Sequence, residues 1–466
     1  MNHGFMTDYQ PLTGDIIQKL RDTLGPSCMD FRSDVLDEFS RDGSDLTSRP
    51  ELAIRVQETW QVERLLGLAN EYHFPVTPRG AGTGLAGGCL PAHGGVVLSL
   101  TMMDRILAID RKNLIARVEP GVITKDLREA AHRQGLFYPP DPAGLESSTI
   151  GGNAATSAGG PSCLKYGTTK DYVLGLEAVL PSGRLIQTGA QTRKGVVGYD
   201  LTRLLVGSEG TLGVITGLTL KLIPHVPAVY GLAAAFPDLT KAMAAVTDIL
   251  VSGHLPSAIE FMDHKCLGLV GDLLPFRPPD GKATLLIIET DGAEEQVQRE
   301  AALIAEICRR GGATEIIPAP GPAEREKIWE VRRQISLRIH DRSALYLSED
   351  VSVPIGLIAD FVTVLPEFET SFGFEIFTFG HAGDGNLHLN LSAASKHDQD
   401  HMARGAEAIL RKVLQMGGTI SGEHGVGKAK QGFLPLELSP ESLRLQKEIK
   451  NVFDPNQILN PDKIFP

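Results

Sequence analysis

The order of apolar and polar positions changes near residue 225, and this change predicts how the chain is divided. Before it, short apolar runs are separated by long glycine-rich stretches; after it, strand-like runs alternate with amphipathic helical patterns. We therefore expect three parts: a first domain of residues 1–225 with short helices in 1–48, a second domain of 226–420, and a C-terminal segment, 421–466, that returns to the first domain.

Local patterns predict individual elements in both parts. Strands are expected where apolar residues run or alternate, and helices where they recur at helical spacing. Before residue 225 we expect strands at Leu52–Val56, Val96–Leu100, Val173–Leu180 and Gly217–Ile223, a hairpin at Ile106–Val118, and helices at Ile16–Leu24, Thr59–His73 (with Thr59 as its cap) and Thr124–Gln134. Beyond it we expect strands at Tyr230–Phe236, Ala258–Met262 and Ala283–Thr290, and helices at Leu239–Ser252, Glu294–Arg310 and Ile328–Ile339.

Three glycine-rich stretches stand between the strands of the first part: Pro75–Gly88, Leu145–Gly160 and Gly207–Thr216. The first contains a GxGxxG match, but the proline and glycines that follow it argue against the helix that a dinucleotide fold needs. Bare backbone N–H groups can instead wrap phosphates, with Arg79 as counter-charge. We expect the second stretch to be a polar, flexible loop outside the core. Together the stretches predict one large α+β domain around an extended cofactor.

The segment Phe379–Asn390 carries two histidines between glycines and Asx residues. Its glycines disfavour a helix, and alternation on both sides of Asp384-Gly385 predicts a hairpin with a two-residue turn. That turn would place His381 directly opposite His388, about 5 Å apart at Cβ, with Asn390 on the same face. Two imidazoles at that spacing can share one metal ion.

A second cluster, Ser421–Lys428, supplies candidate partners for that ion. Glu423 could complete a site of two histidines and one carboxylate, and His424 could stay off the metal and act as a base. Gly422–Lys428 also matches the phosphate-binding loop Gly-x4-Gly-Lys, but Ala429 stands where that loop needs Ser or Thr for magnesium. We treat the loop as a false match, and a nucleotide-binding NTPase stays a distant alternative.

The helical pattern at Ile328–Ile339 sets Trp329, Arg332 and Ser336 on one stripe. Arg332 is a candidate carboxylate anchor, because a guanidinium grips carboxylates through two N–H groups. A surface arginine fits the same pattern equally well. Arg333 is rotated away toward solvent.

Composition excludes several classes of protein. The 466 residues, 42% of them hydrophobic, suit a soluble protein with a large core, and the formal net charge of −12 argues against a nucleic-acid partner. The 5 cysteines are scattered without a CxxC pair, which argues against disulfides and iron–sulfur clusters. No export signal or membrane span is evident. We expect a cytoplasmic protein.

Taken together, these stretches resemble the FAD-linked D-2-hydroxyacid dehydrogenases of the vanillyl-alcohol-oxidase flavoprotein superfamily. That group includes D-lactate dehydrogenases, the glycolate oxidase FAD subunit and D-2-hydroxyglutarate dehydrogenases. The resemblance covers nearly the whole chain. It implies an α+β fold: a two-lobed FAD-binding domain of the vanillyl-alcohol-oxidase type, plus a substrate domain with an antiparallel sheet covered by helices.

The resemblance also implies roles for residues. His381, His388 and Glu423 match metal ligands, His424 the base, and Arg332, Ser336 and Asn390 substrate-binding positions. The first glycine loop lacks a His or Cys for flavin attachment, so we expect non-covalent FAD. The FAD-binding positions implied are Pro78, Arg79, Gly80, Ala81, Gly82, Thr83, Gly84, Leu85, Ser147, Ser148, Thr149, Gly151, Gly152, Asn153, Gly160, Glu209, Gly210, Ile215 and Asn460.

The implied activity is oxidation of a D-2-hydroxy acid to the 2-oxo acid. In this hypothesis a divalent metal binds the substrate's carboxylate and hydroxyl, His424 removes the hydroxyl proton, and hydride passes from Cα to flavin N5. Zinc suits the ligand set, and Mn²⁺ or Fe²⁺ also fits. Ser348 stands where hydroxyglutarate-type members carry a lysine, which favours a D-lactate-like monoacid. The alternatives are a D-2-hydroxyglutarate dehydrogenase, a glycolate oxidase FAD subunit, an oxidase that uses oxygen directly, and a non-catalytic metal-stabilised scaffold.

The expected partners follow from the same resemblance. Reduced flavin needs a separate electron acceptor, such as an electron-transfer flavoprotein, an iron–sulfur subunit or a quinone. The resemblance is also compatible with a protein that is attached peripherally to the inner membrane, and with a homodimer.

Overall fold

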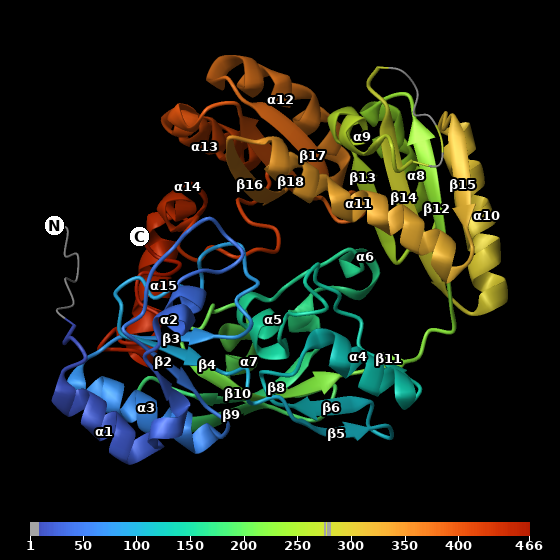
Figure 1. Ribbon diagram of the computed structural model, residues 1–466. Helices are drawn as coiled ribbons and strands as arrows, with labels where there is room; N and C mark the ends of the chain where they lie inside the picture. Colours follow the sequence, from blue (N-terminus) through green and yellow to red (C-terminus); the bar gives the residue numbers. More distant parts are fainter. Residues whose placement is uncertain (1–8, 275, 277–280) are drawn as a thin grey trace. The chain divides into compact units, whose positions relative to one another are not determined.

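The computed structural model describes residues 9–274, 276 and 281–466, and the chain forms two compact units (Figure 1). Unit 1 contains the chain up to Gly159, Thr168–His225 and His424–Pro466; unit 2 contains Gly160–Gly167 and Val226–Glu423. The short segment Gly160–Gly167 leaves unit 1 and rejoins it, an excursion that no sequence pattern predicted.

Unit 1 is built on two larger sheets. In the described part of the chain, one has four strands in the order β1-β2-β4-β3, and the other has five in the order β5-β6-β10-β8-β9. The strands are β1 (Met29–Asp30), β2 (Leu52–Arg55), β3 (Val76–Arg79), β4 (Val96–Ser99), β5 (Ile106–Asp110), β6 (Ile115–Val118), β7 (Leu136–Phe137), β8 (Val173–Val179), β9 (Leu185–Gly189), β10 (Val214–Lys221) and β11 (Ile223–Pro224). The helices are α1 (Gly14–Leu24), α2 (Ser33–Phe39), α3 (Thr59–Tyr72), α4 (Thr124–Arg133), α5 (Ile150–Thr156), α7 (Leu201–Leu205), α14 (Leu434–Glu437) and α15 (Pro440–Phe453).

The end of the chain is part of the core of unit 1. Ile458 and Leu459 are fully buried in the same cluster as Ile54 of β2, Leu65 of α3 and Leu98 of β4. Leu459 also forms a parallel bridge with Val76 at the start of β3. The tail therefore lies beside the strand that leads into the first glycine-rich stretch.

Two local expectations in unit 1 are wrong. Helix α3 is capped by Glu58, not Thr59, because Glu58 and Gln61 exchange side-chain-to-backbone hydrogen bonds in a capping box. The second glycine-rich stretch is not a flexible loop outside the core: Thr149 caps helix α5, which buries Ile150 and Asn153. Its small residues allow close packing rather than disorder.

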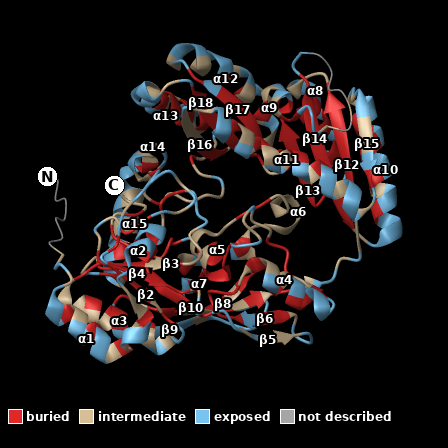
Figure 2. Ribbon diagram, viewed as in Figure 1, coloured by how far each residue is buried: buried red, intermediate tan, exposed pale blue. Residues whose placement is uncertain are grey.

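Unit 2 is organised around one antiparallel sheet. Among the described residues it has seven strands in the order β15-β12-β14-β13-β17-β18-β16, and buried residues make up most of the inner strands but not of the edge strand β15 (Figure 2). The strands are β12 (Ala228–Phe236), β13 (Ala258–Met262), β14 (Thr284–Gly292), β15 (Glu315–Ala319), β16 (Leu345–Ser352), β17 (Glu375–His381) and β18 (Asn386–Ala393). The helices are α6 (Cys163–Tyr166), α8 (Leu239–Val251), α9 (His264–Val270), α10 (Glu294–Arg310), α11 (Pro322–Arg342), α12 (Ile358–Phe372) and α13 (Gln399–Gln415).

Helices cover both faces of this sheet. Helices α9 and α11 pack on the face that carries Met262, Ile287 and Phe379. The alternate residues Leu387 and Leu389 of β18 are also fully buried, and α12 and α13 lie on that opposite side (Figure 1). Along the described residues, no helix combines the length and the apolar character that crossing a membrane requires.

Candidate functional site

The two histidines of the predicted hairpin lie on one face of the sheet in unit 2. The hairpin is present, but its register differs: His381 pairs with Asn386, and His388 pairs with Phe379. The predicted two-residue turn is wrong, because Gly385, at φ 89°, closes a four-residue loop by donating to His381 O at 3.0 Å. A shift of two residues preserves the face of every side chain. The imidazoles therefore still meet, with ring centroids 5.3 Å apart.

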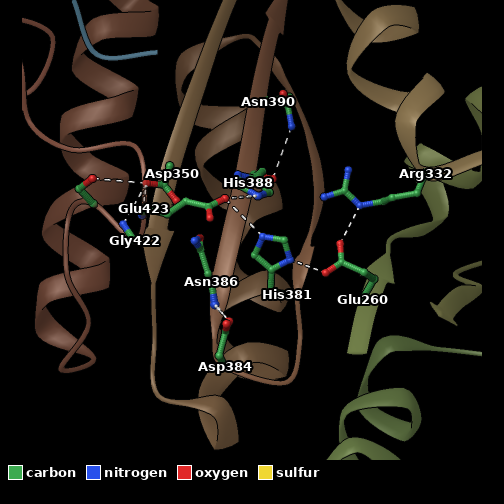
Figure 3. A network of polar contacts seen from close by, with 11 residues as sticks. Glu260, Arg332, Asp350, His381, Asp384, Asn386, His388, Asn390, Gly422 and Glu423 are labelled. Atoms are coloured by element: carbon green, nitrogen blue, oxygen red, sulfur yellow. Dashed lines mark hydrogen bonds and ion pairs between the residues drawn. The ribbon is translucent and has the colours of Figure 1, made fainter. Parts of the chain in front are cut away.

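Glu423 completes the cluster. Its Oε1 lies 3.3 Å from His381 Nε2 and 3.5 Å from His388 Nε2 (Figure 3). One potential ligand atom of each of the three residues, His381, His388 and Glu423, lies within 4.8 Å of the other two. All the side chains are largely buried. Two imidazole nitrogens and one carboxylate in this arrangement fit a divalent transition metal with open positions for substrate.

Asp350 of β16 holds Glu423 in place. Asp350 pairs with His388 in the sheet, and its Oδ2 accepts the backbone N–H groups of Gly422 at 2.9 Å and Glu423 at 2.8 Å. A Cβ at position 422 would lie 2.5 Å from the amide nitrogen of Asn386, so any larger residue there would force that side chain to move. The Oδ1 atom of that buried asparagine has no hydrogen-bond partner among the described residues.

Arg332 is not the surface arginine that the sequence pattern left open as an alternative, because its side chain is 13% exposed. Its Nε donates to Glu260 Oε2 at 2.9 Å, and its guanidinium lies over the Phe379 ring, 3.9 Å from the centroid. The other oxygen of Glu260 bonds His381 Nδ1 (Figure 3). The sequence analysis missed Glu260, because it lies in a strand that reads as plain core and is more than 100 residues from His381.

The charges of this group shift one another's pKa values. Burial alone would raise the pKa of Glu260, but the charges of His381 and Arg332 lower it to about 2. Burial alone would lower the pKa of His381, yet Glu260 and Glu423 raise it well above its usual value. Burial also opposes ionisation of Glu423, and the hydrogen bond and charge of His381 hold its pKa below the ordinary value. Glu260 and Glu423 are therefore ionised at neutral pH, and His381 carries a proton that a bound metal ion must displace.

The other predicted substrate positions lie on the same side of unit 2. Asn390 is buried; its Oδ1 accepts the Tyr346 hydroxyl at 2.6 Å, so its amide is already engaged. Ser348 of β16 pairs directly with Asn390. Ser336 is half-buried, one helical turn beyond Arg332 on α11. His424 directly follows Glu423 and is the first residue of the closing segment of unit 1.

The first and third glycine-rich stretches are joined to the C-terminal segment by hydrogen bonds within unit 1. Asn460 Nδ2 donates to Gly88 O at 2.9 Å and to Glu209 O at 2.7 Å, which ties the first and third stretches to the tail. The carboxylate of Glu209 accepts the N–H groups of Val426 and Gly427, both at 2.8 Å. The carboxylate of Glu209 is therefore occupied by hydrogen bonds within the protein. Asn460 Oδ1, by contrast, is buried without a partner among the described residues.

The first stretch exposes its backbone at its tip. Thr83–Leu85 are exposed, and nothing lies within 4 Å of where a Cβ on Gly84 would be. Arg79, expected as a phosphate counter-charge, is buried instead: it stacks on Phe39 and donates to Cys89 Sγ at 3.2 Å.

The remaining predicted cofactor positions are spread over these segments. Pro78 packs closely on Gly210: a Cβ added at position 210 would lie 2.6 Å from the ring of Pro78. Ser148 and Asn153 bond Thr124, Thr149 caps α5, and Ile215 is a buried residue of β10. Gly80, Ala81, Gly82 and Gly152 are half-buried, Ser147 is exposed, Gly151 packs on Pro120, and Gly160 belongs to unit 2.

Comparisons with known proteins decide the family. A family model described as "FAD linked oxidases, C-terminal domain" matches residues 227–464, and one described as "FAD binding domain" matches residues 50–189. The glycolate oxidase subunit GlcD of Bacillus subtilis is 39% identical, over 97% of this chain and 97% of its own. The D-lactate dehydrogenase of Anaerostipes hadrus is 36% identical, over 98% and 99%.

This chain belongs to the FAD-linked oxidases. A solved structure of alkyldihydroxyacetonephosphate synthase shares the fold with a TM-score of 0.78 and 21% identity, covering 97% of this chain and 86% of that one. The resemblance and the α+β fold expected from the sequence are confirmed. The protein is an FAD-dependent oxidoreductase related to D-lactate dehydrogenase and the glycolate oxidase subunit GlcD, so a non-catalytic scaffold is excluded.

The glycine-rich stretches fit FAD. The exposed tip Thr83–Leu85 can present backbone N–H groups to phosphates, and Asn460, which bonds Gly88 of the same stretch, has a buried Oδ1 without a partner among the described residues that can accept a hydrogen bond. The buried Gly151 and Gly210, by contrast, allow close packing on Pro120 and Pro78. Gly422–Lys428 has no helix, which agrees with treating its phosphate-loop pattern as a false match.

Proposed function

We propose that this FAD-linked oxidase is a metal-assisted dehydrogenase of a D-2-hydroxy monocarboxylic acid, D-lactate or a close relative. The observation that carries the proposal is the buried cluster of His381, His388 and Glu423, whose ligand atoms converge within 4.8 Å. Relatives named for D-lactate and for glycolate support the substrate class. Glycolate is a second candidate, and 2-hydroxyglutarate is expected to be poor.

The residues of the chain divide the work. His381, His388 and Glu423 would hold a divalent cation, for which zinc is the preferred identity and Mn²⁺ or Fe²⁺ also fit. Such a cation, when bound, lowers the pKa of a hydroxyl that it contacts. His424 takes the hydroxyl proton at a ring nitrogen as general base. The exposed glycine stretch and Asn460 would hold FAD non-covalently, and bound FAD supplies the acceptor for the hydride.

One arginine near the proposed metal ligands can bind the carboxylate of the substrate. Arg332 is held beside the histidines, and Asn390 and Ser336 are proposed to contact the substrate as well. The other arginines of α11 are engaged elsewhere: Arg325 lies 3.5 Å from Glu289 and donates to Val229 O, Arg333 pairs with Glu330, Arg338 with Asp272 and Arg342 with Glu375. A second carboxylate would therefore lack a cation, and burying it unpaired is costly. Ser348, which stands in place of the lysine of hydroxyglutarate-type members, likewise supplies no positive charge for a second carboxylate.

Steady-state turnover with a panel of D- and L-2-hydroxy acids and an artificial electron acceptor tests the proposal. We expect the highest kcat/KM with D-lactate, a lower value with glycolate, and little activity with the L-enantiomers. Activity that is independent of the metal, or a preference for an L-acid, would contradict it. The physiological acceptor is proposed to be a separate protein or a quinone.

A further inference from the structure

We propose that Glu260 is a positioning residue of the metal centre: one carboxylate holds His381 with Nε2 directed at Glu423 and, through its other oxygen, holds Arg332. The inference rests on the proposed function, because it concerns the same site. Its basis is the geometry of Glu260, which no sequence pattern singled out.

Sheet register places Glu260 beside the histidine. Glu260 of β13 pairs directly with His381 of β17, so the two side chains point to the same face as neighbours. Glu260 is fully buried, and a buried carboxylate is tolerated only when it is paired and hydrogen-bonded. Both its oxygens are engaged, Oε1 by His381 Nδ1 and Oε2 by Arg332 Nε. The site therefore contains a fixed charge.

That charge selects the nitrogen of His381 that faces the centre. A neutral imidazole carries one N–H and one lone pair. A cation bound at the centre must displace the Nε2 proton. Because Nδ1 keeps its N–H to Glu260, the lone pair is then on Nε2, the atom 3.3 Å from Glu423. Without the carboxylate, both tautomers and other ring orientations become available. A carboxylate behind a ligating histidine also raises its basicity.

The second oxygen orients the arginine. Arg332 has Glu260 as its only hydrogen-bond acceptor among the described residues, and its guanidinium lies over the ring of Phe379. This contact uses Nε and leaves the terminal nitrogens to grip a substrate carboxylate. Metal ligand and carboxylate anchor are thus aligned by one side chain, which predicts that its loss affects both.

Glu289 offers a matched control. It is a largely buried glutamate on the neighbouring strand β14, bonded to Trp329 at 2.8 Å and 3.5 Å from Arg325 of α11. Its surroundings resemble those of Glu260, with an arginine from the same helix, but none of the described histidines is among its partners. Glu289→Gln removes a buried charge from this sheet without touching His381.

The experiment measures Zn²⁺ affinity of the purified flavoprotein after chelation. We expect Glu260→Gln to weaken Zn²⁺ binding about 10-fold and Glu260→Ala about 100-fold, with FAD content and the urea midpoint of Glu260→Gln near parental values. Glu289→Gln should stay within about twofold of the parent. Glu260→Gln should also raise KM for the hydroxy acid, and its Co²⁺ form should show an altered visible spectrum.

The outcomes separate the inference from the proposed function. If His381→Ala binds Zn²⁺ as tightly as the parent, the metal site itself is misassigned. If His381→Ala loses Zn²⁺ but Glu260→Gln keeps parental affinity and an unchanged Co²⁺ spectrum, the role of Glu260 is refuted. An equal loss in Glu289→Gln would also refute it, because any buried charge would then have the same effect. If Glu260→Ala fails to fold, the isosteric glutamine variant decides.

Discussion

At the scale of single residues, the proposed mechanism gives two neighbours in the chain different tasks: Glu423 holds the metal ion, and His424 accepts a proton. Glu423 lies against both histidines, and Asp350 fixes its backbone by accepting two N–H groups. His424, the next residue, is left for proton transfer in the proposed mechanism. Adjacent positions can therefore be tested independently.

Replacing His424 by alanine should leave metal and FAD bound but slow flavin reduction by substrate. Loss of general-base help is expected to cost about 10²–10⁴-fold, or roughly 3–5 kcal/mol in the barrier. Stopped-flow absorbance of the flavin measures it. Exposed His397→Ala is the control. Reduction of the His424 variant at a near-parental rate would remove it as the base.

The flavin should be released completely by acid precipitation. Cys89 is the thiol next to the first glycine stretch, and burial raises the pKa of that thiol to about 11, so it stays protonated and unreactive. Absorbance of supernatant and pellet after precipitation measures the release. Yellow colour that remains in the pellet would show a covalent bond.

Ser348 should set the preference against diacids. Because Ser348 pairs with Asn390, a lysine there would bring a cation to the site face of the sheet. We expect the parent to favour D-lactate over D-2-hydroxyglutarate in kcat/KM, and Ser348→Lys to shift the ratio toward the diacid. Thr363→Lys, at an exposed position of α12, is the control. A parental preference for hydroxyglutarate would refute the argument.

At the scale of elements, the C-terminal helix carries a buried ion pair that fixes the tail. Lys450 of α15 pairs with Asp454 and donates to Thr211 O and Leu459 O, both at 2.8 Å. Asp454 in turn accepts the N–H groups of Ile458 and Leu459. The pair thereby joins α15, the third glycine-rich stretch and the strand-like tail.

Breaking this pair should strongly destabilise the protein. Lys450→Met leaves the Asp454 carboxylate buried without its cation, and we expect a loss of about 3–5 kcal/mol in the free energy of unfolding. Urea unfolding followed by flavin fluorescence measures it. Glu448→Gln, in the exposed pair with Arg444 on the same helix, should cost less than about 1 kcal/mol. Equal effects would show that the buried pair has no special role.

At the scale of the whole molecule, the two proposed cofactors belong to different units. The proposed metal ligands lie in unit 2, and the proposed FAD-binding segments lie, apart from Gly160, in unit 1. Besides the short excursion at Gly160–Gly167, the chain passes into unit 2 after His225 and leaves it after Glu423, so the last proposed ligand stands at a junction. Each cofactor should therefore be removable without loss of the other.

Chelation should abolish turnover and leave FAD in place. His381→Ala and His388→Ala should each lose metal for the same reason, because each removes one of three ligands. Metal analysis and the flavin spectrum of the same sample measure both quantities. Parental metal content in the two variants, or loss of FAD on chelation, would show that the site is elsewhere or that the units are coupled.

Much of the fold follows from the sequence because it depends on local periodicity. Strand β13 and helix α10 begin and end at the predicted residues, and the change in pattern near 225 coincides with the unit boundary in the structure. The meeting of His381 with His388 also needed only alternation, since a register error of two residues leaves the face unchanged. Family membership followed from motifs read in order.

Only the tertiary structure decided what depends on contacts between distant segments. Alternation places Glu260 on one face of a strand, but only the pairing of β13 with β17 brings it to His381 and makes Arg332 its partner. Small residues in 150–156 read as a loop, yet a cap and close packing on Pro120 stabilise a helix. Local pattern carries no information about which buried polar groups meet, because their partners lie far away in the chain.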